Sequence, residues 1–166
     1  MNEDELLKLA EENGIDVVET SLPESGSLIV EQAGACTVGL DSGLRGPRKK
    51  ARLAHELGHA MKGALYRASS PLVTRSRCEY RANKWAYTHL VPLDQLEKIC
   101  AAHLSEPLCV IAEEMDLPED FLSAAIRYYW TAGELIRSVS MDRPALKDRE
   151  LTVLRVHTFG KMSQSI

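Results

Sequence analysis

The pattern of hydrophobic and polar positions divides the chain into a strand-forming part and a helical part. Residues 3–13 have the period of an amphipathic helix, which Gly14 can end in the left-handed conformation. Three later runs, IDVVET, SLIVEQ and ACTVGLD, have the length and composition of short strands and are separated by turn-forming residues. The amino-terminal part therefore predicts one helix followed by three strands.

Helical periodicity dominates the rest of the chain. Two long helices are predicted over about residues 47–66 and 77–91, with a loop over residues 67–76 between them. Shorter helices are predicted over about residues 93–103, 106–115 and 118–133. The sum is an α+β fold, in which a small antiparallel or mixed sheet packs on a pair of long helices and further helices follow.

The 166 residues have the length of a single domain. Residues 1–92 are expected to form its core, and residues 93–133 a helical extension of the same domain. Residues 134–166 are expected to be a tail that is partly disordered or contains a late strand, ELTVLRVHTF.

Composition excludes several classes of protein. The formal net charge of −4 argues against a general electrostatic attraction to nucleic acid, and the run PEDFLSAAIRYYW offers only Arg127 as a basic contact. The acidic start MNEDELLKLAEENG is not a secretory signal, and no run is long enough to cross a membrane. The four cysteines form no C-x-x-C pair, which favours reduced thiols in a cytoplasmic protein over a zinc-thiolate site.

The stretch AHELGHAM, residues 54–61, carries the candidate chemistry. His55 and His59 lie one turn apart, separated by about 40° on one helix face, while an apolar stripe occupies the opposite face. Glu56 lies beside the pair, where its carboxylate can reach a water on a metal, and Gly58 leaves room for a neighbouring segment. The alternative is that both histidines are solvated on a polar helix face.

A catalytic zinc usually has three protein ligands, so a third ligand decides between these interpretations. A histidine six residues after His59 is excluded, because Leu65 stands there. On the second long helix Glu79 shares a face with Ala82, Asn83 and Ala86, and the two alanines allow a close approach of the helices. Glu79 is therefore favoured as the third ligand, with Asn83 accepting a hydrogen bond from a ligand histidine.

Two alternatives for these residues stay open. His89 is a rival third ligand, although it points about 80° away from Glu79 on the helix. Glu79 could also be a surface carboxylate that pairs with Arg77 or Arg81.

The motif H-E-L-G-H, followed by E-x-x-A-N-x-W-A-x-x-x-L-V-P, resembles the ImmA/IrrE family of zinc metallopeptidases. The resemblance spans about residues 29–92, and IAEEMDLPEDFLSAAIRYY is similar to the helix-turn-helix-like continuation of that family. Asn83 departs from the pattern where an acidic residue is also common, and residues 87–89 vary the usual stretch. The resemblance implies a zincin-like core with Zn²⁺ bound by His55, His59 and Glu79, and with Glu56 as the catalytic base.

The resemblance also implies a cytoplasmic bacterial protease, from a mobile element or a stress-response locus, that cuts a helix-turn-helix transcriptional repressor. Tyr66 and His89 are the candidates for the hydrogen-bond donor to the oxyanion. The ACTVGLD strand is expected to be the sheet edge to which a peptide substrate adds. The alternative function is a non-catalytic, zinc-stabilised module that binds a regulatory partner. Neither the protease nor the binding module requires nucleic acid or a membrane as a partner.

Overall fold

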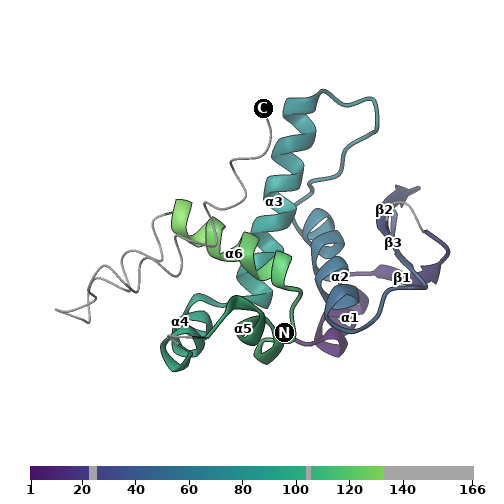
Figure 1. The fold of residues 1–166 in the computed structure, drawn as a ribbon. Coiled ribbons are helices and arrows are strands. Elements are labelled where there is room, and N and C mark those ends of the chain that lie inside the picture. The colour runs from purple at the N-terminus through teal and green to yellow at the C-terminus, as the bar shows by residue number, and fades with distance from the viewer. Residues whose placement is uncertain (23–25, 104–105, 133–166) are drawn as a thin grey trace.

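The computed structural model describes residues 1–22, 26–103 and 106–132 (Figure 1). The described elements are α1 (Glu3–Glu12), β1 (Ile15–Thr20), β2 (Ser27–Gln32), β3 (Ala35–Asp41), α2 (Gly46–Met61), α3 (Leu72–Leu90), α4 (Leu93–Ala102), α5 (Leu108–Glu114) and α6 (Glu119–Thr131). The predicted α+β class and its three strands are confirmed. The predicted tail and its late strand lie outside the described residues.

The other elements form two groups around the helix pair α2–α3. In Figure 1 the sheet and α1 lie on the side of α2, while α4, α5 and α6 lie around the carboxy-terminal half of α3. Within the described ranges, no helix has the length and apolar composition that a bilayer-spanning segment needs.

Local sequence explains the first two elements. Asn2 Oδ1 accepts a hydrogen bond from the Glu5 backbone N–H at 2.8 Å, and the Glu5 carboxylate accepts one from the Asn2 N–H at 2.9 Å. This reciprocal pair is a capping box, which satisfies free N–H groups at the start of α1. Gly14 adopts a φ of +65°, which turns the chain directly into β1.

The sheet is mixed, with strand order β1-β3-β2. Strand β3 runs parallel to β1 and antiparallel to β2, and its side chains Val38 and Leu40 are fully buried. The expectation that ACTVGLD forms a sheet edge is therefore wrong, because β3 is the central strand. A tight turn at Ala33 and Gly34, both with positive φ, folds β3 back beside β2, and β1 pairs with its other side. The free edge nearest α2 belongs to β2.

The two long helices are confirmed with shifted ends. Helix α2 ends at Met61 instead of Tyr66, and Gly63 then turns the chain with a φ of +53°. Helix α3 begins at Leu72, so half of the predicted loop over 67–76 is helical. Pro71, with its φ of −55°, directly precedes the first turn of α3, a position where a proline is tolerated.

Helices α4–α6 share an apolar core with the α2–α3 pair, and polar contacts add to this packing. The Tyr129 hydroxyl donates to the backbone oxygen of Val91 at 2.6 Å. The Lys50 ammonium group, which is buried, lies 2.6 Å from the carboxylate of Asp116 in the turn before α6. These contacts support the helix pair from the side opposite the sheet.

Gly58 sets how closely α2 and α3 approach. A Cβ atom at this position would lie 2.5 Å from the Ala82 carbonyl oxygen and 3.0 Å from the Ala82 Cα. Because both are backbone atoms, no side-chain rotation can relieve the overlap. The sequence-based prediction that Gly58 leaves room for a neighbouring segment is confirmed.

Gly58→Ala is therefore expected to force the two helices apart and to lower the free energy of unfolding by about 2 kcal/mol. This loss should exceed the gain of up to about 1 kcal/mol that alanine normally brings to a helix interior. Urea unfolding followed by circular dichroism measures it. Arg48→Ala, on an exposed position of the same helix, is the control and should stay within about 0.5 kcal/mol of the parent. A Gly58→Ala protein as stable as the control would contradict the close approach.

Candidate metal centre

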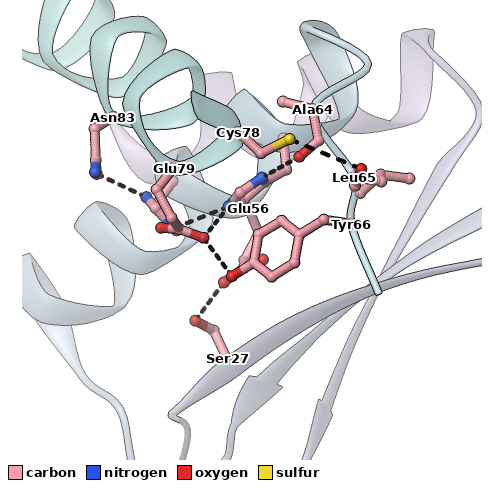
Figure 2. Close-up of polar contacts among 10 residues, drawn as sticks. Ser27, Glu56, Ala64, Leu65, Tyr66, Cys78, Glu79 and Asn83 are labelled. Atoms are coloured by element: carbon pink, nitrogen blue, oxygen red, sulfur yellow. Dashed lines mark hydrogen bonds and ion pairs between the residues drawn. The ribbon is translucent and has the colours of Figure 1, made fainter. Parts of the chain in front are cut away.

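Three predicted ligand residues converge where α2 and α3 face each other. His55 and His59 come from successive turns of α2, and Glu79, which Figure 2 labels, comes from α3. One ligand atom from each lies within 4.8 Å of the others. The two histidine Nε2 atoms are 3.2 Å apart, and they lie 3.4 Å and 3.3 Å from the oxygens of the Glu79 carboxylate. This spacing is close enough for one metal ion to contact all three.

Hydrogen bonds on the far side of each imidazole orient the pair. His55 Nδ1–H donates to Asn83 Oδ1 at 2.9 Å, and His59 Nδ1–H donates to the Ala64 carbonyl oxygen at 2.9 Å. Because both acceptors are oxygens, each ring carries its proton on Nδ1 and presents the Nε2 lone pair to the centre. Burial lowers the pKa of His55, which favours the neutral form that binds metals.

Glu56 lies beside this group, and its side chain is only 6% exposed. The Ser27 hydroxyl, at the start of β2, donates to Glu56 Oε1 at 2.7 Å (Figure 2). Glu56 lines the same cleft as His55, His59 and Glu79. The structure thus places a buried carboxylate next to the candidate metal position, as the H-E-L-G-H motif predicts.

Tyr66 is also brought to the centre. Its hydroxyl donates to Glu79 Oε1 at 2.6 Å, and its ring lies 5.9 Å from the His59 ring. The hydrogen bond to Glu79, with a smaller contribution from burial, raises the pKa of Tyr66 to about 12. The phenol therefore keeps its proton, and remains a donor, throughout the neutral pH range.

His89 lies elsewhere. Its ring stacks on Trp85 with centroids 4.0 Å apart, and its Nδ1–H donates to the Trp85 carbonyl oxygen at 2.7 Å. It does not belong to the cleft lining or to the group of ligand atoms found in the described part of the chain. The structure therefore does not bring His89 to the position that either a third ligand or an oxyanion donor needs.

A cleft of about 710 Å³ opens above the three ligand residues. One wall is the edge strand β2 with residues 27–31 and the turn at Ala33 and Gly34. The opposite wall is the segment of residues 65–67, which connects α2 to α3. A backbone edge that runs along a ligand cluster is an arrangement that accepts an extended peptide.

Residues 10–126 match the family model Peptidase_M78, described as the IrrE N-terminal-like domain. The chain belongs to the ImmA/IrrE family. This match covers both helices of the candidate centre and the sheet beside it, and it confirms the resemblance that the motifs indicate. Among curated proteins, no significant match is found.

The donor set of this ImmA/IrrE chain suits a divalent metal. The Nε2 atoms of His55 and His59, each with its lone pair, lie 3.2 Å apart beside the Glu79 carboxylate. These electron-rich groups repel one another unless a cation lies among them. Within the described ranges, no lysine or arginine forms an ion pair with Glu79. Two histidine nitrogens and a carboxylate oxygen form the ligand set of many catalytic zinc sites. The residues present therefore fit the metal that a metallopeptidase family implies.

Two hydrogen bonds of the centre, from His59 to Ala64 and from Ser27 to Glu56, were not predicted from the sequence. The Ala64 carbonyl that orients His59 is a backbone atom, so no residue type reveals it. Ser27 is an ordinary strand residue 29 positions before Glu56, and no periodic pattern links the two. Asn83, in contrast, was predicted from the face that it shares with Glu79.

Proposed function

We propose that this chain is a zinc-dependent endopeptidase that hydrolyses a peptide bond in a specific regulatory protein, a helix-turn-helix transcriptional repressor. The observation that carries the proposal is the buried Glu56 carboxylate beside the convergent His55, His59 and Glu79. A metal site that serves only stability has no use for an additional carboxylate at its edge. This residue therefore favours a catalytic centre over a non-catalytic binding module.

His55, His59 and Glu79 would hold the zinc ion. When bound there, zinc supplies activation of a water molecule and polarisation of the scissile carbonyl group. The hydrogen bonds from His55 to Asn83 and from His59 to Ala64 keep the ligand nitrogens directed at that position.

Glu56 is assigned the proton transfers. Its carboxylate accepts a proton from the attacking water as the new C–O bond forms, and it then delivers that proton to the amine nitrogen as the C–N bond breaks. Its burial keeps bulk water from competing for the carboxylate, and its place in the cleft wall puts it within reach of a bound peptide.

Tyr66 is the stronger of the two candidates for stabilising the oxyanion. Its hydroxyl lines the cleft and lies at the ligand cluster, whereas His89 lies outside the cleft lining. The phenol would exchange its hydrogen bond to Glu79 for one to the developing negative charge.

The substrate is proposed to bind as a strand added to β2. The Asp41 N–H donates to the Gly26 oxygen, so this residue pair is hydrogen-bonded across β2 and β3. By the alternation of an antiparallel ladder, the backbone groups of Ile29 and Glu31 then point to the free edge, toward the cleft. An extended segment within a longer protein can pair there without needing a free terminus, which supports endopeptidase activity. The choice of a repressor as substrate rests on the family resemblance.

The proposal is tested with Glu56→Gln as a substrate trap. The variant is used to capture proteins from the host, the bound proteins are identified by mass spectrometry, and each is incubated with zinc-loaded wild type. We expect a captured helix-turn-helix repressor that the wild type cuts at one site. A variant lacking both Glu56 and the zinc ligand His55 is the control for cleavage by contaminants. A repeatedly captured partner that stays intact would contradict the protease assignment and favour the binding module.

A further inference from the structure

We propose that Ser27 is a positioning residue for Glu56. Its hydroxyl donates to Glu56 Oε1 at 2.7 Å, and both side chains are buried, with exposures of 8% and 6%. In the part of the chain that the structure describes, no other hydrogen bond reaches the Glu56 carboxylate. Ser27 thus holds one oxygen and leaves Oε2 for the reaction. The inference rests on the proposed function, because it requires Glu56 to be the base.

The carboxylate needs such a partner because its side chain rotates about three bonds. A general base must be held within about 0.5 Å and 10–20° of its productive position. A hydrogen bond to a charged acceptor is strong enough to select one orientation among the rotamers. Without the Ser27 hydroxyl, the carboxylate would be buried beside the cleft with no hydrogen bond from the described residues to fix its orientation.

The hydroxyl itself is held by the sheet. Ser27 is the first residue of β2 and lies opposite the fully buried Leu40 of β3. The neighbouring Gly26 oxygen accepts a hydrogen bond from the Asp41 N–H at 2.8 Å, which secures the start of the strand. Glu56 belongs to α2, so the Ser27–Glu56 bond joins the proposed base to the strand proposed to bind the substrate.

A buried serine that merely satisfies its own hydroxyl would show the same contact, so the test must detect an effect that passes through Glu56. Acetohydroxamate is a suitable probe, since it chelates zinc and its hydroxyl proton passes to a neighbouring carboxylate that is correctly placed. Its affinity for the zinc-loaded full chain is measured by calorimetry and needs no knowledge of the substrate. Zinc content and the melting temperature are measured for every variant.

We expect Glu56→Ala and Ser27→Ala each to weaken acetohydroxamate binding by about tenfold, with zinc content and melting temperature unchanged. Ser27→Thr keeps the hydroxyl and should restore binding to within about twofold of wild type. In the Glu56→Ala background, Ser27→Ala should change the affinity by less than about twofold, since there is no carboxylate left to orient. Ser42→Ala, at an exposed turn, is the control and should have no effect.

Three outcomes would overturn the inference in distinguishable ways. If Glu56→Ala weakens binding and Ser27→Ala does not, Ser27 does not position the base, and the proposed function stands. If Ser27→Ala weakens acetohydroxamate binding by the same factor in the wild-type and Glu56→Ala backgrounds, or if it removes zinc, the role of Ser27 is structural. If Glu56→Ala leaves the affinity unchanged, the assignment of Glu56 as the base fails, and the inference fails with it.

Discussion

Glu56→Gln is expected to lower the rate of peptide-bond cleavage by about 10²- to 10⁴-fold while the fold and the bound zinc are retained. Glutamine has nearly the same size and shape as glutamate, and its carbonyl oxygen can still accept the hydrogen bond from Ser27. It cannot take a proton from the attacking water, because the amide is not basic. The change therefore removes the proton transfer and leaves the structure around it in place.

The measurement compares initial cleavage rates on the captured substrate with zinc content determined by mass spectrometry. Glu113→Gln is a matched control, because Glu113 is an exposed carboxylate on α5 that does not line the cleft. The control should keep its rate within a few-fold, as expected of a surface carboxylate away from the reacting atoms. Cleavage by Glu56→Gln at the wild-type rate would show that another group accepts the proton.

Glu79→Ala is expected to remove most of the bound zinc. Loss of an outer-shell hydrogen-bond partner typically weakens metal binding by about 10- to 100-fold, and loss of a direct ligand should cost more than that. The two histidines alone leave the cation with one protein donor fewer and with no negative charge from the ligand set. Because the Glu79 side chain is 37% exposed, its truncation should cost little packing, and the apoprotein should stay folded.

Zinc titration monitored by calorimetry gives the affinity, and the rise in melting temperature on adding zinc gives an independent reading. Asn83→Ala provides the graded comparison, because it removes only the acceptor for His55 Nδ1–H. This variant should bind zinc about 10- to 100-fold more weakly than wild type. Glu113→Ala, an exposed carboxylate on α5, is the control for a change of charge. Unchanged zinc binding by Glu79→Ala would show that the third ligand is a different residue.

The sequence by itself determined the local structure and much of the candidate centre. The three strands were predicted with the bounds that the structure shows, because alternation and turn residues act over a few positions. The face shared by His55 and His59 follows from helical geometry alone, and the missing side chain of Gly58 predicted room for a neighbouring segment. The same geometry placed Glu79 and Asn83 on one face of α3, and the structure brings that face to the histidines.

Only the tertiary structure decided the order of strands and the contacts across the centre. Chain order suggested ACTVGLD as an edge, but β3 pairs on both sides, so the cleft is bordered by β2. The bonds of Tyr66 to Glu79 and of Ser27 to Glu56 join segments 13 and 29 positions apart, and the placement of His89 against Trp85 removes it from the cleft. Periodicity reports which face of an element is apolar, and it carries no information on which two faces meet. That choice depends on packing between distant segments, and here the packing places Ser27 beside the proposed base.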